Sequence, residues 1–588
     1  MQTPSRRRAL STAVVGAVGL ALLAAATPAS ALEPDLIGDF ASSSNASDPS
    51  AYRCHNPNGT GSLGWCLTTS KDRNESPYNA HGPAENYYPM SETLTFFSTD
   101  GIKWGAPQTG VDEDDLYRAI PYLGWRNLEG NNHQWAPAVR YLQTPGGRAE
   151  WPINNYFMYT PNLLEKADKY SSRIWMTYST NPSTGFGQTT IPHDTWQDET
   201  KLIEGVPENT TGFIEKYPMY MSDPDVFTDS SASDYYSLAN VNKDYLIWAD
   251  GDNATCGGIS MRKMTNQWTV EAFTDPNQAW LPINGLNEGP EALGSCSKNY
   301  KGAVNQSIGR PYLEGASLFH SNRWSASKTS EGLPGPYVLV FAAKPTLVPE
   351  PCKSTYGETN STNEVIAYAT ATNVKGPYAY QGIIMCGSES EWTNQATIEE
   401  VKALDGSSRL VLIYHDGPKD GNRNRQLHAE CLYAINGKFV KTMRSTDGVA
   451  SVSGAKNWCL KRAEVVALKS RSVGKYVTVK DDGLEASSTY IGPYEQFSFE
   501  DRDGDEVEIN ARRTGLYTGP STTKIPATVD PRANITWTLE HVSGTAYRIK
   551  GEDDRYLRTA SSGRVYSGSK NPSSTDTSYD FWVEALSN

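Results

Sequence analysis

Short apolar runs rich in β-branched and aromatic residues recur along the chain, each bounded by Gly, Pro, Asn or Asp. Runs of this length and composition are typical of β-strands. No long stretch repeats its apolar residues at the spacing of an amphipathic helix. The sequence therefore predicts an all-β protein. The clearest runs are Tyr156–Tyr159, Arg173–Tyr178, Asp244–Trp248, Tyr337–Phe341, Val365–Tyr368 and Leu410–Tyr414.

The length and charge of the chain limit its architecture and its partners. With 588 residues, the chain is longer than one ordinary domain. Hydrophobic residues make up 38% and aromatic residues 11%, which excludes a disordered chain and favours packed cores. The formal net charge is −14, whereas phosphate binding requires a basic face. We therefore expect two or more domains and no nucleic-acid partner.

Residues 1–31 have the features of an export signal. Three arginines at 6–8 precede an apolar run over 9–26, and Ala29-Ser30-Ala31 follows as a small-residue cleavage site. A membrane anchor is the alternative, but the run is short and ends at the cleavage-type site. Removing the segment changes the net charge from −14 to −17. We expect a secreted, extracellular monomer with no membrane segment in its mature form.

Eight cysteines in an exported chain predict four disulfides. None of them forms a C-x-x-C pair, so a zinc or redox site has little support. We expect sequential pairing, although eight cysteines allow many other arrangements. The expected pairs are Cys54–Cys66, Cys256–Cys296, Cys352–Cys386 and Cys431–Cys459.

The C-terminal region contains a repeat of about 40 residues with two aromatic strand signals in each copy. The first signals are Gly474-Lys475-Tyr476, Gly515-Leu516-Tyr517 and Asp554-Arg555-Tyr556, and the second are Phe497–Glu500, Trp537–Glu540 and Phe581–Glu584. Three such repeats predict a β-trefoil over residues 463–588. The region resembles the fascin-like and ricin-like trefoils, and this resemblance implies carbohydrate binding. A passive spacer is the alternative.

A looser repeat spans roughly residues 40–460, within the domain that we expect over residues 32–462. Five turn sequences recur there, and each is expected to close a pair of strands. They are Ser98–Gly101, Ser179–Asn181, Met264–Asn266, Thr370–Asn373 and Ser445–Gly448. Five such turns predict a five-bladed β-propeller. The fold class that we expect is therefore an all-β chain with a five-bladed β-propeller followed by a β-trefoil.

Three acidic residues lead strand-like runs and would converge at the centre of a propeller. Each motif taken alone is weak, because Asp before Pro is usually a turn former and because Glu-Gly recurs elsewhere in the chain. The three are Asp48 before Trp65–Leu67, Asp223 before the run that ends at Trp248, and Glu314 before Tyr337–Phe341.

The order of the motifs is more specific than any one of them. In chain order they are Asp48-Pro49-Ser50, Leu67–Ser70, Tyr88-Pro89-Met90, Phe97–Trp104, Trp135-Ala136-Pro137, Asp223-Pro224 with Phe227, Glu314-Gly315, Ile366–Ala369, Gly376-Pro377-Tyr378, Thr393-Asn394, Tyr414-His415 and Arg425. Over residues 45–450 this set resembles glycoside hydrolase family 43, the five-bladed propeller arabinofuranosidases and xylosidases.

The resemblance implies a role for each acid. Asp48 would be the general base that deprotonates water, and Glu314 the general acid that protonates the leaving oxygen. Asp223 would orient the acid and keep its pKa raised, because a nearby carboxylate disfavours ionisation. An inverting glycosidase needs acid and base carboxyls about 6.5–9.5 Å apart, with water between base and sugar. Glu288 in Glu288-Gly289-Pro290 is the rival for the acid, and the strand that follows Glu314 favours Glu314.

The resemblance also implies substrate contacts, with two departures from the family pattern. Trp135 would stack on a sugar or pack between blades, and Arg425 would bind a hydroxyl, fix Asp223 or form a surface ion pair. Ala138 stands where many members have Asp. Gln395 stands where the family commonly has a His at a metal in the channel, and His415 does not obviously replace it. We therefore predict no metal and no cofactor.

These features together predict a secreted inverting glycoside hydrolase that releases arabinofuranosyl or xylosyl units from a polysaccharide. One alternative is a hydrolase of another glycan, such as a galactan or a cell-wall arabinan. A second alternative, from another class, is a non-catalytic sugar-binding propeller. A change of Asp48 to Asn separates the classes, because a lectin would keep binding sugar and never release a reducing end.

Overall fold

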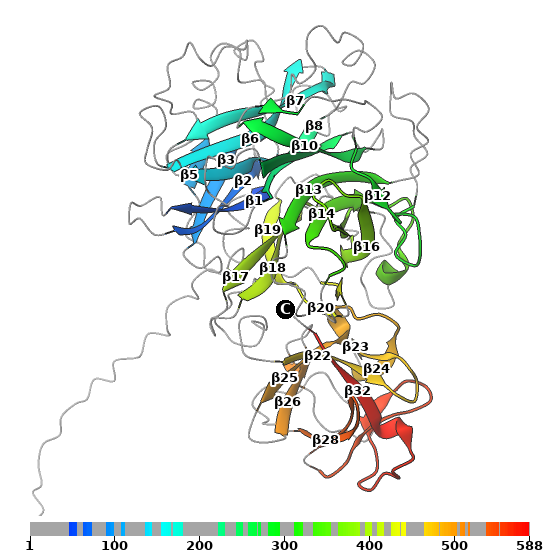
Figure 1. The fold of residues 1–588 in the computed structure, drawn as a ribbon. Coiled ribbons are helices and arrows are strands. Elements are labelled where there is room, and N and C mark those ends of the chain that lie inside the picture. Colours follow the sequence, from blue (N-terminus) through cyan, green and yellow to red (C-terminus); the bar gives the residue numbers. More distant parts are fainter. Residues whose placement is uncertain are drawn as a thin grey trace, which may run out of the picture.

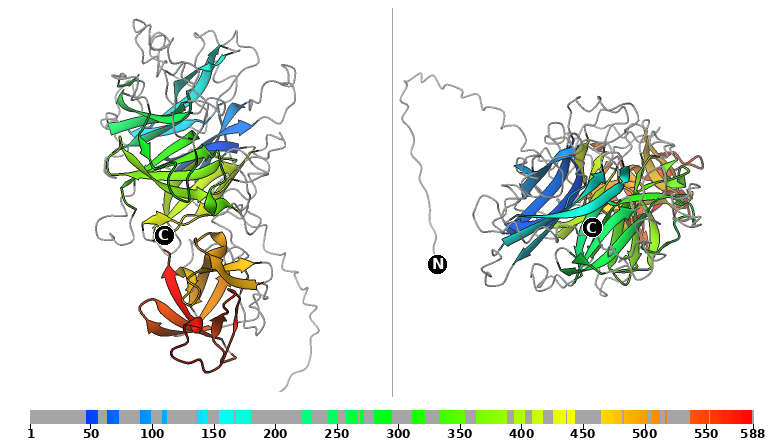
Figure 2. Two further views of the ribbon diagram at one scale, coloured as in Figure 1. Left: turned by 90° about the vertical axis from the view of Figure 1, so that its right-hand side faces the viewer. Right: turned by 90° about the horizontal axis from the view of Figure 1, so that it is seen from above.

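The computed structural model describes residues 46–55, 63–72, 90–98, 108–111, 136–143, 154–165, 168–179, 221–229, 243–250, 257–266, 269–271, 280–294, 311–320, 333–353, 363–387, 394–402, 408–416, 425–435, 437–442, 464–480, 483–501, 506–511, 516–517, 537–551 and 553–586 (Figures 1 and 2). Within these ranges the protein consists of strands and three short 3₁₀ helices, with no α-helix. The prediction of an all-β protein is confirmed, and each of the six strand-like runs lies inside a strand. In the same ranges, no helix is long and apolar enough to cross a membrane. The predicted export signal lies outside them.

The larger, N-terminal unit contains five sheets of three to five strands among the described residues. Neighbouring strands are antiparallel, except that β12 pairs with β16 in parallel. The sheets are β1 (Ala46–His55), β2 (Leu63–Asp72), β3 (Met90–Ser98) and β4 (Gln108–Val111); β5 (Ala138–Gln143), β6 (Asn154–Glu165) and β7 (Asp168–Ser179); β8 (Met221–Thr228), β9 (Asp244–Asp250), β10 (Gly258–Asn266) and β11 (Thr269–Val270); β13 (Tyr312–His320), β14 (Tyr337–Lys344), β15 (Val365–Ala371), β16 (Tyr378–Met385) and β12 (Ile283–Asn284); and β17 (Ala396–Lys402), β18 (Ser408–Asp416) and β19 (Gln426–Cys431). A short pair, β20 (Ala434–Ile435) and β21 (Lys438–Phe439), follows.

The first strands of the five sheets contact one another in sequence. β1 contacts β5, β5 contacts β8, β8 contacts β13, β13 contacts β17, and β17 contacts β1. We call this closed set of strands the strand ring. Hydrogen bonds connect some of these neighbours. Ser50 Oγ of β1 accepts from the Val139 amide of β5 at 3.1 Å, and an Asp225 carboxylate oxygen of β8 accepts from the Leu318 amide of β13 at 3.0 Å. Residues at the start of each first strand are therefore brought to one place.

Four positions at the starts of these strands share an unusual backbone. Asp48, Ala136, Asp223 and Gly315 have φ values of 52°, 46°, 49° and 56°. The pairing register of β1, β8 and β13 shifts at this point, between Ser47 and Ser50, Ser222 and Asp225, and Glu314 and Ser317. A left-handed residue in a bulge re-aims its side chain, and Asp tolerates that conformation better than most residues.

This geometry corrects one part of the sequence prediction. Asp48, Asp223 and Glu314 each lie inside a first strand of their own, in β1, β8 and β13, and the runs that they were expected to lead are the second strands β2, β9 and β14. The bulge, with its Pro or Gly, interrupts the alternation by which a strand is recognised in sequence. The first strands were missed for that reason.

Two of the four expected disulfides are confirmed. Cys54–Cys66 joins β1 to β2, and Cys352–Cys386 joins the 3₁₀ helix Glu350–Cys352 to the end of β16. The other two pairs, Cys256–Cys296 and Cys431–Cys459, fall on residues or side chains outside the described part of the chain. The bridged cysteines are 12 and 34 residues apart in the sequence, so both bridges fix local geometry rather than joining distant sheets.

The C-terminal unit, drawn orange to red in Figure 1, is built around six strands that close on themselves. The order is β22, β25, β26, β28, β29 and β32, and β32 pairs back with β22. Hairpins of short strands and two 3₁₀ helices, Pro493–Glu495 and Thr577–Tyr579, extend from this closed set. The strands are β22 (Glu464–Ser470), β23 (Tyr476–Lys480), β24 (Gly483–Ser488), β25 (Gln496–Asp501), β26 (Glu506–Ala511), β27 (Leu516–Tyr517), β28 (Trp537–Ser543), β29 (Ala546–Gly551), β30 (Leu557–Thr559), β31 (Val565–Ser567) and β32 (Asp580–Ala585).

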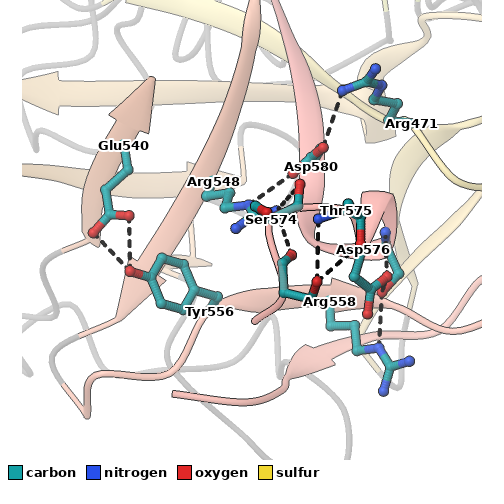
Figure 3. A network of polar contacts seen from close by, with 11 residues as sticks. Arg471, Glu540, Arg548, Tyr556, Arg558, Ser574, Thr575, Asp576 and Asp580 are labelled. Carbon is teal, nitrogen blue, oxygen red and sulfur yellow. Dashed lines mark hydrogen bonds and ion pairs between the residues drawn. The ribbon is translucent and has the colours of Figure 1, made fainter. Parts of the chain in front are cut away.

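A polar network holds the end of this unit together (Figure 3). The Asp580 carboxylate, 1% exposed, accepts from Arg548 Nε at 2.9 Å and from Arg471 Nη1 at 3.2 Å. The Tyr556 hydroxyl lies 2.8 Å from both carboxylate oxygens of Glu540. A buried carboxylate with two guanidinium partners is satisfied, so we assign Asp580 a structural role.

The two units share an apolar contact through β22. Val465 and Ala467 pack in a core that includes Phe96 of β3 and Val411 of β18. The alternate residues Val466 and Leu468 face the core of the C-terminal unit itself. Because successive side chains of a strand point to opposite faces, β22 is buried on both sides. The C-terminal unit is therefore packed against the first and fifth sheets.

Candidate active site

Asp48 lies in the bulge of β1 and is 4% exposed. Its Oδ1 accepts a hydrogen bond from Arg425 Nη1 at 3.0 Å, and Arg425 itself is 4% exposed at the start of β19. The amide of Asp48 donates to His415 Nδ1 at 2.9 Å. Because Nδ1 accepts, His415 carries no proton there, and its 3.5 Å approach to the carboxylate is not an ion pair. The guanidinium is thus the cation that holds the Asp48 carboxylate.

Asp223 occupies the same position in β8 and is 9% exposed. Its Oδ2 accepts from the amide of Gly315 at 3.2 Å, so the residue after Glu314 is bonded directly to it. Burial, then the charges of Glu314 and Asp48, raise the pKa of Asp223 well above its usual value. Arg425 and the Gly315 amide act in the opposite direction. Asp223 therefore interacts with Glu314 and Asp48 through their charges, and with the backbone beside Glu314 through a hydrogen bond.

Glu314 lies at the bulge of β13 and is more accessible than the two aspartates. The Tyr312 hydroxyl donates a hydrogen bond to its Oε2. Burial, then the charge of Glu364 and a hydrogen bond with it, raise the pKa of Glu314 well above the usual range, and Asp48 adds to this. These surroundings favour the protonated form of Glu314, which is the form that a general acid requires.

Glu364 was not among the residues that the sequence predicted. It immediately precedes β15 and is 1% exposed, and its Oε2 accepts from the Asn394 amide at 3.1 Å. Burial raises the pKa of Glu364 to about 7, while the hydrogen bond with Glu314 and the charge of Lys344 oppose that rise. The signal in the sequence was a lone glutamate immediately before a strand of mostly apolar residues, Val365–Ala371, which is buried along its whole length. We refer to Asp48, Asp223, Glu314 and Glu364 as the carboxyl cluster.

The remaining predicted residues fall in different places. Arg425 joins the cluster through its hydrogen bond to Asp48. Glu288, the rival for the acid, is exposed in a turn where its amide donates to Gly285 at 3.0 Å. Trp135 lies outside the described residues, next to Ala136 and its left-handed backbone.

Gln395 is the residue that stands where the resemblance led us to look for a metal-ligating His. It is 8% exposed, and its side chain packs against Gly315. Within the described part of the chain, no three His, Cys, Asp or Glu side chains gather to hold a metal ion. The neighbouring His415 Nδ1 is already bonded to the Asp48 amide. With a glutamine at this position and His415 Nδ1 already bonded, these residues do not fit a protein-ligated metal.

Comparisons with known proteins find resemblance only at the level of solved structures. No protein-family model and no curated protein matches the sequence. A GH43 β-xylosidase/α-arabinofuranosidase from a compost microbial metagenome, crystallised with xylotriose, is 16% identical over 70% of this chain and 98% of its own, with a TM-score of 0.40. A GH43_1 enzyme from Xanthomonas citri, also with xylotriose, is 14% identical over 68% and 91%, with a TM-score of 0.37. An exo-β-1,3-galactanase from Clostridium thermocellum is 12% identical over 92% and 95%, with a TM-score of 0.37. Resemblance this distant assigns neither an activity nor a residue.

Proposed function

We propose that the chain is a glycoside hydrolase in which Glu314 is the general acid and Asp48 is the general base. The observation that carries the proposal is the contrast between these two carboxyls, which lie in one electrostatically coupled cluster. Asp48 is held by the guanidinium of Arg425, whereas Glu314 bonds to another carboxyl and keeps its proton. Carboxyls with opposed environments are the arrangement that acid–base hydrolysis of a glycoside requires.

The proposed reaction is a single displacement by water. Asp48 accepts a proton from water as the water oxygen bonds to the anomeric carbon. The bond from that carbon to the leaving oxygen breaks, and Glu314 gives its proton to this oxygen. The product sugar has the inverted configuration, and no covalent intermediate forms. No cofactor takes part in the proposal.

Asp223 is proposed to orient the acid. Its hydrogen bond from the Gly315 amide fixes the backbone on which Glu314 is carried. Its carboxyl also belongs to the group of acids whose mutual repulsion disfavours ionisation. Arg425 is proposed to hold the base in place, because its Nη1 donates a hydrogen bond to Asp48 Oδ1.

The architecture that we propose around this site is a five-bladed β-propeller over residues 32–462 and a β-trefoil over 463–588. The closed strand ring supports the first, because innermost strands of a propeller surround a common axis. The six-stranded closed set with hairpins supports the second. With a signal over 1–31, the enzyme would be a secreted monomer that releases arabinofuranosyl or xylosyl units from a polysaccharide.

Three single substitutions test the assignment of the acid and the base. Asp48→Asn and Glu314→Gln each remove one proton-transfer group, so we expect kcat on aryl pentosides to fall by about 10²–10⁴-fold. Glu288→Gln is the matched control and should retain wild-type kcat, because Glu288 is exposed in a separate turn. If Glu288→Gln abolishes activity while Glu314→Gln does not, the assignment is wrong.

The reaction itself is tested on a panel of aryl glycosides with proton NMR of the first product. Release of arabinose or xylose with inverted anomeric configuration supports the proposal. Retention of configuration contradicts the mechanism, and release from galactosides alone moves the substrate to another glycan. Sugar binding without release, unaffected by Asp48→Asn, would instead show a sugar-binding propeller.

A further inference from the structure

Glu364 forms a hydrogen-bonded pair with Glu314. The two side chains come from adjoining parts of one sheet, since Glu314 lies in β13 and Glu364 precedes β15, with β14 between them. The Asn394 amide fixes Glu364 by donating to its Oε2, and the Asn394 side-chain amide donates to the Glu364 carbonyl at 2.5 Å. Two carboxyls can share a hydrogen bond only if at least one of them is protonated. At least one proton therefore resides on the pair.

Titratable and charged groups from every neighbouring element influence the ionisation of this pair. They are Tyr312 on the strand of Glu314, Lys344 at the end of β14, Asp48 and Asp223 from β1 and β8, and Arg425, which acts on both aspartates. Lys344 favours the ionised form of Glu364, whereas Glu364 favours the protonated form of Glu314. Glu364 is thus the acceptor of the shared proton and Glu314 is the donor.

We propose that Glu364 is a positioning residue for the general acid, which keeps the transferable proton on the Glu314 carboxyl by accepting a hydrogen bond from it. This inference rests on the proposed function. Glu364 is 1% exposed, so it acts through Glu314 and does not touch the sugar. In the reaction the O–H bond of Glu314 breaks and an O–H bond to the leaving oxygen forms. Glu364 gains and loses no proton in that step.

The test is the pH dependence of kcat/KM in Glu364→Gln. The alkaline limb reports loss of the proton from the pair. Glutamine keeps the shape of the side chain and can accept the same hydrogen bond, but it removes the negative charge that retains the proton. We expect the alkaline limb to move to lower pH by about one unit or more, while the acidic limb stays in place.

Glu291→Gln is the control for a merely structural glutamate. Glu291 is partly buried and accepts from the Ile383 amide and Lys441 Nζ, both at 2.7 Å, outside the carboxyl cluster. That variant should lose stability without any shift of the alkaline limb. A uniform fall of kcat/KM in Glu364→Gln, with the limb unmoved, would overturn the proposal. If the Gln variant does not fold, Glu364→Asp serves instead, because it keeps a carboxyl on a shorter side chain. Its alkaline limb should shift in the same direction, and an unshifted limb would overturn the proposal equally.

Infrared titration separates this inference from the proposed function. At about pH 8, one unit above the pKa of about 7 for Glu364, the wild type should retain a protonated-carboxyl C=O band that is lost in Glu314→Gln and weakened in Glu364→Gln or Glu364→Asp. A wild type that hydrolyses no glycoside but shows this band would refute the function and keep the pair. Absence of the band, or a band unchanged by these substitutions, would refute the pair.

Discussion

At the residue scale, the site depends on backbone that most side chains avoid. Asp48 and Asp223 adopt left-handed φ values, and Gly315 does so beside Glu314. A non-glycine residue in that region costs about 1–2 kcal/mol, which the packing of the surrounding strands must offset. In a regular strand, successive side chains point to opposite faces. The left-handed residue in the bulge breaks this alternation and re-aims the acidic side chain. Three of the four members of the carboxyl cluster, Asp48, Asp223 and Glu314, are therefore placed by local bulges.

Gly315 gives a prediction at this scale. A Cβ there would lie 2.9 Å from Cγ of Gln395 at φ +56°, whereas a Cβ on Gly289 at φ +72° would meet no atom within 4 Å. Gly289→Ala should lose about 1–2 kcal/mol of unfolding free energy through the backbone alone. Gly315→Ala should lose about 1–3 kcal/mol more through the clash, and kcat should fall because Glu314 is displaced. Urea unfolding and kcat on one aryl glycoside measure both effects; equal losses in the two variants would contradict the contact.

At the element scale, side-chain hydrogen bonds link neighbouring strands of the strand ring. Asp225 of β8 accepts from the Leu318 amide of β13, and Ser317 Oγ donates to Thr397 Oγ1 of β17 at 3.2 Å. Each bond joins first strands of neighbouring sheets rather than strands within a sheet. The ring thus has polar links in addition to apolar packing.

The stability contributed by Asp225 should depend on pH. Burial raises the pKa of Asp225 from 3.8 to about 6, although the amide bonds oppose this. The folded state therefore binds the proton more tightly than the unfolded state, and up to about 3 kcal/mol present at low pH is lost as the pH rises from about 4 to about 6. Asp225→Asn keeps the acceptor for Leu318 but cannot ionise. Urea unfolding over this pH range should show a smaller fall in the variant; parallel curves would show that Asp225 does not contribute.

The strands that could be predicted from the sequence are those that the composition of a single short run is enough to identify. Val365–Tyr368 and Leu410–Tyr414 read as strands from their own composition and became β15 and β18. Glu364 could not be placed, because its contact with Glu314 depends on how β13, β14 and β15 pack across a separation that no short motif encodes. For the same reason Asp48, Asp223 and Glu314 were recognised as acids of interest but assigned to the wrong strands.

At the scale of the whole molecule, β22 joins two cores. Val465 and Ala467 pack with side chains of the first and fifth sheets, and Val466 and Leu468 pack inside the C-terminal unit. Gln496 Nε2 adds a bond to the Lys441 carbonyl at 3.1 Å. Units that share a buried strand should unfold together.

Substitutions on the two faces of β22 test this coupling by calorimetry. The wild type should show a single cooperative transition. Val465→Asp places a carboxylate in the contact between the units, so the transition should split in two. Val466→Asp, its neighbour on the other face, should instead unfold the C-terminal unit alone. An unsplit transition at the wild-type Tm in Val465→Asp would show that the units are not coupled through this strand.

The two-sided burial of β22 also bears on how a long ligand would meet the protein. A flexible linker lets an anchoring module sample many distances from a reacting centre, and the effective concentration follows the linker length. Here the C-terminal unit is packed in one orientation through Val465 and Ala467. Under the proposed function, a polysaccharide bound by the C-terminal unit would reach the carboxyl cluster only at a fixed distance from that unit. The rigid packing of the two units would then fix the distance along the polymer between the bound segment and the hydrolysed bond, which a flexible linker would leave variable.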